Sequence, residues 1–231
     1  MFRIGVDVGG TNTDAVVMQG DEILSGVKST TTEDVMSGVV DAVERAIAEA
    51  AIDKAAVTAV MIGTTHFTNA VVERRHLART AAVRLCLPAA QCLPPMVDWP
   101  DDIREAVGGQ FWMAKGGNEF DGRSISELDM AELDAIAKDI GEAGIDTVAI
   151  TSVFSPVSDA MERAAMARLA ERLPGVEFTL SSEIGRLGIL ERENAAIMNA
   201  SLRALSERTV EAFGRALHKV GLDCAYYITQ N

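Results

Sequence analysis

The sequence predicts an α/β protein whose mixed sheet opens as a three-stranded antiparallel meander. Residues 2–8, 15–18 and 22–30 are rich in β-branched and other apolar side chains, which favours strands. The turns between them contain Gly9-Gly10 and Gln19-Gly20-Asp21, so consecutive strands can pair as hairpins. Later in the chain, helical and strand patterns alternate, as is typical of α/β folds.

Two helices and two strands are expected after the meander. Apolar residues spaced three and four apart predict a helix over residues 33–51, with Thr32 as its capping residue. Residues 57–62 are almost continuously apolar, which is typical of a strand buried on both faces. A short helix over residues 67–75 and a strand over residues 80–87 follow.

Residues 88–122 interrupt this regular pattern. Prolines and the pairs Gly108-Gly109 and Gly116-Gly117 predict an irregular insertion or lid. Regular alternation then resumes. Helices are predicted over residues 129–143, 159–172 and 189–218, and strands over residues 147–154, 177–180 and 225–228.

The composition excludes several classes of protein. The chain has 231 residues, of which 48% are hydrophobic and 24% charged, so disorder is not expected. Its net charge of −13 argues against binding to nucleic acid. No apolar stretch approaches the ~20 residues of a membrane helix and no leader precedes the first strand, so we expect a cytoplasmic protein. Cys86, Cys92 and Cys224 lack the spacing of a zinc site and are expected to be free thiols.

The loop after the first strand is the most informative part of the sequence. Gly9 and Gly10 let the backbone approach an anion closely, so successive N–H groups can point at phosphate oxygens. Thr11, Asn12 and Thr13 add side-chain donors. Asp7, on the strand just before the loop, could hold Mg²⁺, which usually takes only one or two carboxylates. The alternative is an ordinary hairpin turn with a capping aspartate.

A second polar motif follows the strand over residues 57–62. Thr64, Thr65 and Asn69 come directly after the strand end, where ligands gather in open α/β sheets. Asn69 lies one helical turn after Thr65, so both side chains can face one site. The alternative is that Thr65 caps the helix and Asn69 is a surface residue. His66 could act as an acid or base, although a single histidine is more often structural.

The charged run Glu191-Arg192-Glu193 has a simpler interpretation. It is expected to be a solvated helix face, because neighbouring charges of both signs suit such a face. Asn199, two turns later on the same helix, could be turned inward.

Several segments carry a resemblance to a known family. Residues 7–14 (Asp-Val-Gly-Gly-Thr-Asn-Thr-Asp) and 63–74 (Gly-Thr-Thr-His-Phe-Thr-Asn-Ala-Val-Val-Glu-Arg) resemble the paired signature of the hydantoinase A/oxoprolinase family. Residues 117–123 and 191–200 resemble further family segments, except that residues 194–196 (Asn-Ala-Ala) replace the usual hydroxyl residues. The position of the glycine loop also resembles the acetate kinase, sugar kinase, Hsp70 and actin superfamily. The resemblance implies a ribonuclease H-like or actin-like ATPase lobe.

The resemblance also implies how the chain is divided. Residues 1–174 match an N-terminal domain, with the insertion at about residues 88–122, and residues 175–231 match the start of the main domain. The family binds nucleotide between two lobes, and its second phosphate loop does not occur in these 231 residues. Residues 226–231 resemble the strand that leads into that loop. We therefore expect the natural protein to continue past Asn231 and this part alone to be inactive.

The activity implied by the resemblance is ATP-dependent hydrolysis of a cyclic amide such as hydantoin or 5-oxoproline. ATP would phosphorylate the carbonyl oxygen, with Mg²⁺ at Asp7, phosphate at residues 9–13, and Thr64, Thr65 and Asn69 in catalysis. Alternatives are an ATP-dependent ketone carboxylase, a small-metabolite kinase and a non-catalytic nucleotide switch. The expected partners are a small cyclic amide or ketone and a second hydantoinase-type subunit, or further copies of the same chain.

Overall fold

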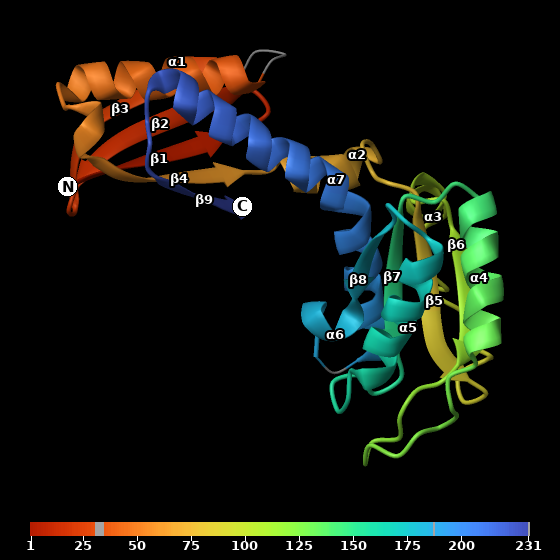
Figure 1. Cartoon of the computed structure of the whole chain (residues 1–231). Coiled ribbons are helices and arrows are strands. Elements are labelled where there is room, and N and C mark those ends of the chain that lie inside the picture. The colour runs from red at the N-terminus through yellow and green to blue at the C-terminus, as the bar shows by residue number, and fades with distance from the viewer. Residues whose placement is uncertain (31–34, 187, 231) are drawn as a thin grey trace. The chain divides into compact units, whose positions relative to one another are not determined.

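The chain forms two compact units. The computed structural model describes residues 1–30, 35–186 and 188–230. Unit 1 comprises residues 1–73 and 205–231, and unit 2 comprises residues 74–204. The 32-residue helix α7 (Ile189–Val220) contributes to both units (Figure 1). Within the described ranges, no helix is long and apolar enough to cross a membrane. The boundary expected at residue 174 separates two segments of the family and not these two compact units, and it stays a prediction.

Unit 1 is built on a five-stranded sheet with the order β3-β2-β1-β4-β9. Strands β1 (Phe2–Val8), β2 (Asn12–Gln19) and β3 (Glu22–Thr30) pair antiparallel, so the predicted meander is confirmed. Strand β4 (Val57–Thr64) lies parallel to β1, and β9 (Ala225–Gln230) lies parallel to β4. A meander extended by parallel strands is the arrangement of ribonuclease H-like folds, and the predicted fold class is confirmed.

One face of this sheet is covered by helices. Helix α1 (Val35–Ala50) packs on it, as predicted, while its expected cap Thr32 lies outside the described residues. The carboxy-terminal half of α7 completes the same core with Phe213 and Leu217. Alternate residues of each strand point into this core, because side chains alternate across a sheet. The core residues from β1 and β4 include Ile4, Val6, Val8, Val60 and Ile62.

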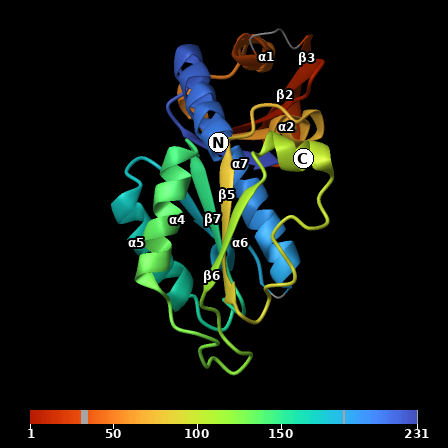
Figure 2. The same cartoon turned by 90° about the vertical axis from the view of Figure 1, so that its right-hand side faces the viewer.

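Unit 2 contains a four-stranded sheet in which every pair is parallel. The order is β6-β5-β7-β8 (Figure 1). Figure 2 shows β6, β5 and β7 of this sheet from another side. Its strands are β5 (Thr80–Leu87), β6 (Gln110–Lys115), β7 (Thr147–Ser152) and β8 (Glu177–Leu180). Parallel strands are normally covered on both faces. This explains why β5 and β7 are buried almost throughout.

Helices cover both faces of the unit 2 sheet. Helices α4 (Met130–Glu142) and α5 (Ala160–Arg172) pack on the face that carries Val83 of β5 and Ile150 of β7. The amino-terminal half of α7 packs on the other face, where Ala82 and Ala149 meet small and branched residues of the helix. The α7 residues in this contact are Ala196, Ile197 and Ala200.

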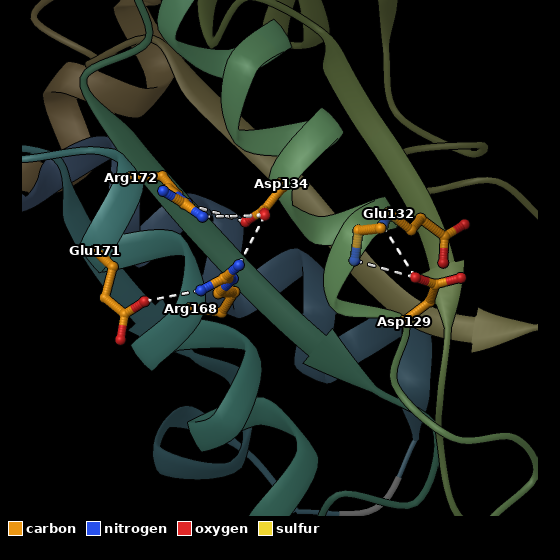
Figure 3. Close-up of polar contacts among 7 residues, drawn as sticks. Asp129, Glu132, Asp134, Arg168, Glu171 and Arg172 are labelled. Carbon is orange, nitrogen blue, oxygen red and sulfur yellow. Dashed lines mark hydrogen bonds and ion pairs between the residues drawn. The ribbon is translucent and has the colours of Figure 1, made fainter.

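Ionic contacts join α4 to α5 and fix the start of α4 (Figure 3). Asp134 on α4 accepts hydrogen bonds from Arg168 at 2.7 Å and from Arg172 at 3.1 and 3.2 Å. The Arg172 and Arg168 guanidinium groups hold the pKa of the Asp134 carboxyl below its ordinary value. Asp129 caps α4 by accepting from two backbone amides at 3.1 and 3.2 Å and also binds Lys115 at 3.0 Å.

Residues 88–122 are more regular than the sequence suggested. They contain helix α3 (Asp101–Ala106) and strand β6, which pairs with β5 along its length. The segment therefore supplies one edge of the unit 2 sheet. Other elements also differ from the prediction: β2 begins at Asn12, which shortens the glycine loop, β7 ends at Ser152 and not at residue 154, and the short helix α6 (Ser181–Ile184) was not expected.

Candidate functional site

The glycine loop forms a tight connection between β1 and β2. Val8 and Thr13 are the last paired residues of the hairpin, and the Gly9 amide donates to the carbonyl oxygen of Asn12 at 3.0 Å. A side chain at Gly10 would meet nothing within 4 Å, so this position is open to an approaching ligand. Thr13 is fully buried and points into the core. The exposed part of the predicted phosphate loop is therefore Gly10 and Thr11.

Asp7 lies on the open face of the sheet, opposite the helices. Its side chain is exposed, and its cross-strand partner is Asp14 on β2. On the other side Asp7 is in register with Gly63 of β4, which has no side chain to crowd the carboxylate. Lys28 forms an ion pair with Asp14 at 3.6 Å. The sheet thus presents two carboxylates side by side, just before the glycine loop.

The two carboxylates suit the Mg²⁺ ion that the sequence predicted at Asp7. Like charges directly opposite each other on a sheet repel, and a cation beside them would relieve that repulsion. Mg²⁺ commonly takes one or two protein carboxylates and completes its shell with water and phosphate oxygens. No cluster of three or more acidic, histidine or cysteine side chains occurs in the part of the chain that the structure describes. A site completed by nucleotide phosphate fits this donor set better than an all-protein site.

The polar residues after β4 take different roles. Thr64 is buried, and its Oγ1 accepts from the His66 amide at 3.1 Å, so Thr64 caps helix α2 (His66–Glu73). Thr65 and Asn69 are half-buried, and Asn69 Nδ2 donates to Thr65 Oγ1 at 3.4 Å. The structure therefore brings the side chains of Thr65 and Asn69 together, whereas it buries Thr64. The His66 ring packs edge-on against Phe67, with 6.3 Å between the centroids.

Both motifs of unit 1 lie at one edge of the sheet. Strands β1, β4 and β9 are parallel, so their carboxyl ends point the same way. Val8 is in register with Thr64, and Thr64 is in register with Gln230. The glycine loop and the Thr65 turn consequently leave neighbouring strands at the same level. In open α/β sheets this edge is the usual place for a ligand.

In unit 2, the expected solvated face of α7 is in fact buried. Arg192 and Glu193 are almost fully inaccessible, and of this charged run only Glu191 is exposed. Asn199 is exposed as well, so the expectation that it could be turned inward was wrong. Glu193 forms an ion pair with Arg84 of β5, with Arg84 Nε donating to Oε1 at 2.8 Å and Nη2 donating to Oε2. The prediction was wrong because each buried charge has a partner from a distant segment, which local spacing does not reveal.

Arg192 belongs to a second buried network, at the carboxyl end of β7. Its guanidinium donates to Ser181 Oγ at 2.9 Å, to the Ser152 carbonyl at 2.8 Å and to the Arg186 carbonyl at 2.9 Å. Ser181 Oγ donates in turn to the buried carboxylate of Glu162 at 2.6 Å. Burial lowers the pKa of Arg192, although Glu162 and Glu193 act in the opposite direction.

Cys86 lies beside the Arg84–Glu193 pair and is also buried. Burial raises the pKa of its thiol to about 11, so the thiol stays protonated at neutral pH. A protonated, buried thiol is a poor nucleophile. Cys92 and Cys224 are free thiols as well, as the sequence predicted.

These features define a class of protein: an α/β chain with a ribonuclease H-like sheet and a glycine loop preceded by carboxylates. A family model described as the hydantoinase/oxoprolinase N-terminal region matches residues 3–173. The chain therefore belongs to the hydantoinase/oxoprolinase family, and the resemblance found in the sequence is confirmed. No match to a curated protein sequence was found.

Two solved structures share the fold over almost the whole chain. A nucleotide-free acetone carboxylase, from work on ATP-dependent acetone carboxylation, has a TM-score of 0.79 and 16% identity. The ATP-dependent caprolactamase from Pseudomonas jessenii has a TM-score of 0.76 and 21% identity. Each comparison covers 98% of this chain and 35% of the other. The chain thus spans about a third of the length of these proteins.

Proposed function

We propose that this chain is the nucleotide-phosphate-binding part of an ATP-dependent enzyme that opens a cyclic amide. The observation that carries the proposal is the meeting of the Gly9-Gly10 loop, Asp7 and the Thr65–Asn69 pair at one edge of the unit 1 sheet. Membership of the hydantoinase/oxoprolinase family and the fold shared with an ATP-dependent caprolactamase support it.

In the proposed mechanism, the residues of this chain position and neutralise the phosphates of ATP. Gly10 and Thr11 are exposed at the loop, and their amides would donate to phosphate oxygens. Asp7 and Asp14 would hold Mg²⁺, which supplies the positive charge that phosphoryl transfer needs. Transfer of the terminal phosphate to the amide oxygen makes the carbonyl carbon electrophilic, and water then opens the ring and releases phosphate. Thr65 and Asn69 could orient the group that receives the phosphate.

Other parts of the enzyme would complete the site. Because the chain spans about a third of the proteins whose fold it shares, we propose that the remainder supplies a second phosphate loop. A second hydantoinase-type subunit or further copies of the chain would be its partners. Dependence on ATP agrees with the cytoplasmic location expected from the sequence.

Carboxylation of a ketone is the second candidate, favoured by the shared fold with acetone carboxylase. There the enol oxygen of the ketone would receive the phosphate, and the same loop and carboxylates would serve. The two candidates differ in the acceptor and the product, so one set of assays separates them.

The first experiment is to measure phosphate release by the full-length natural protein with Mg-ATP. Hydantoin, 5-oxoproline, caprolactam and acetone would be tested one at a time, with bicarbonate present for acetone. Stimulation by a cyclic amide, coupled to ring opening, supports the proposal. Stimulation by acetone with carboxylate formation supports the second candidate. ATP binding without stimulation by any of these compounds would count against both.

The role of Asp7 is tested by Asp7→Asn in the same assay. Removing one charge that is needed in the transition state should lower turnover by roughly 100-fold. The matched control is Asp21→Asn, which changes an exposed carboxylate in the turn between β2 and β3. Unchanged turnover in Asp7→Asn, with the fold intact by circular dichroism, would remove Asp7 from the proposed metal site.

A further inference from the structure

The open face of the unit 1 sheet carries a cation in the same row as the two carboxylates of the proposed metal site. Successive register pairs put one residue from each of the five strands into a single row across the sheet. Residues directly opposite one another on paired strands share a face, so the whole row lies on the open face with Asp7. In the order from β3 to β9, the row consists of Lys28, Asp14, Asp7, Gly63 and Thr229.

Lys28 acts first on Asp14. The Lys28 Nζ lies 3.6 Å from Asp14 Oδ1, and Asp14 stands between Lys28 and Asp7 in the row. Opposite charges on neighbouring strands attract each other, whereas like charges side by side repel. One ammonium beside two carboxylates leaves the row with a single net negative charge.

The neighbouring rows consist of uncharged residues. Towards the glycine loop, Asn12 of β2 is paired with Thr30 of β3. In the opposite direction, the next row is made of Gly26, Val16, Gly5, Met61 and Tyr227. The charge that a ligand meets on this part of the sheet is therefore set mainly by Lys28 and the two carboxylates.

Arg3 is the other basic residue of the sheet. Strands β2, β4 and β9 contain no lysine or arginine in their sequences. Arg3 lies four residues before Asp7 on β1, which is about 13 Å along a strand. Its guanidinium donates to the Gly20 carbonyl at 3.1 Å. Within the described strands of unit 1, Lys28 is thus the basic residue that lies beside the carboxylates.

This arrangement favours a metal ion that arrives with phosphate over a free metal ion. Two carboxylates without a counter-cation attract free Mg²⁺ strongly and repel the phosphates of a nucleotide. An ammonium group beside them weakens both effects. Specificity is a difference of affinities, and a site can reach it by binding the wrong ligand less well.

We infer that Lys28 is a specificity-determining residue, which makes the site take Mg²⁺ as its nucleotide complex and not as the free ion. The inference rests on the proposed function, because Asp7 and Asp14 are the metal ligands proposed there. In the absence of ligand, Lys28 pairs with Asp14 and lowers the affinity for free Mg²⁺. When the complex binds, the same ammonium offsets the repulsion between Asp14 and the phosphates.

The test compares Lys28→Met with the unmodified protein for two ligands of opposite charge. Mn²⁺ alone stands in for Mg²⁺ and broadens nearby NMR signals, and it is titrated into the full chain without nucleotide at low ionic strength. Mg-ADP, which is not turned over, is titrated calorimetrically into the full-length natural protein under the same conditions.

The two affinities should change in opposite directions. We expect Lys28→Met to bind Mn²⁺ about threefold more tightly, with broadening centred on Asp7 and Asp14, and Mg-ADP about threefold more weakly. The change is moderate because the Lys28 and Asp14 side chains are 65% and 44% exposed, so that solvent screens the pair. Both differences should shrink in about 1 M salt, where the screening length is only about 3 Å. A loss of structure would instead weaken the binding of both ligands.

Two variants serve as controls. Lys138→Met removes an exposed lysine of α4 that pairs with Glu142 at 3.7 Å, and it should change neither affinity. Lys28→Arg keeps the charge and should restore both affinities. An unchanged Mn²⁺ affinity in Lys28→Met, or a change of both affinities in the same direction, would overturn the inference. A lack of Mg-ADP binding by the unmodified protein would contradict the proposed function itself, and the Mn²⁺ titration, which needs no nucleotide, would still show whether Lys28 controls the metal.

Discussion

The buried ion pair between Arg84 and Glu193 makes a strong prediction at the scale of single residues. Glu193→Gln would leave the buried Arg84 guanidinium without its counter-charge. We expect the free energy of unfolding to fall by about 3–5 kcal/mol, measured by urea denaturation. The control, Glu211→Gln, removes an exposed partner that lies 3.5 Å from Arg215 and should leave the midpoint almost unchanged. Similar losses in both variants would contradict a special role for the buried pair.

The same residues show where prediction from sequence stops. Glu193 meets a partner 109 positions away, so no local pattern could have distinguished it from an exposed helix residue. Asp14 is different, because its position could have been derived. A hairpin that closes at Val8 and Thr13 necessarily places Asp7 opposite Asp14. Counting back from the loop would therefore have added a second carboxylate to the predicted magnesium site.

At the scale of elements, the contact between α4 and α5 depends on Asp134 (Figure 3). Its pKa is lowered in the folded state, so its contribution to stability is present above the ordinary value of 3.8. That contribution is lost as the pH falls through the lowered folded-state pKa. We expect Asp134→Asn to lower the urea midpoint modestly at pH 7, and the difference from the unmodified protein to shrink as the pH falls below 3.8.

A matched variant separates this contact from a general effect of charge. Asp98→Asn removes an exposed carboxylate of the same unit and should alter the midpoint little at any pH. If the Asp134→Asn difference stayed constant between pH 7 and pH 3, the ionised carboxylate would not be its source.

Prediction of whole elements was most accurate where the pattern was regular. Strands β1, β3, β5 and β8 have the predicted bounds, and β-branched or other apolar residues occur along each of them. Strand β6 was missed. Its six residues do not alternate, and the glycine pairs on both sides made the region resemble a loop. Pairing with β5 stabilises this strand, and such tertiary context outweighs local preference.

At the scale of the whole molecule, the sequence predicted the class of fold and the position of the glycine loop. It did not predict that unit 1 is discontinuous. Strand β9 pairs with β4, and α7 returns the chain to the core that α1 covers. Nothing in a local pattern specifies which earlier strand a late strand will join. The sequence alone therefore could not show that Thr65 and the glycine loop lie at the same level of the sheet. That conclusion required the register of β1, β4 and β9, which the structure provides.

The separate hydrophobic cores of the two units predict separate responses to core substitutions. Ile62→Ala in β4 and Ile150→Ala in β7 each remove a fully buried side chain and should cost about 2–5 kcal/mol. Amide hydrogen exchange should accelerate mainly in unit 1 for the first variant and mainly in unit 2 for the second, with each half of α7 following its own unit. Ile23→Ala, at an exposed position of β3, should change neither pattern. Equal loss of protection in both units after either core substitution would mean that the chain opens as one cooperative body.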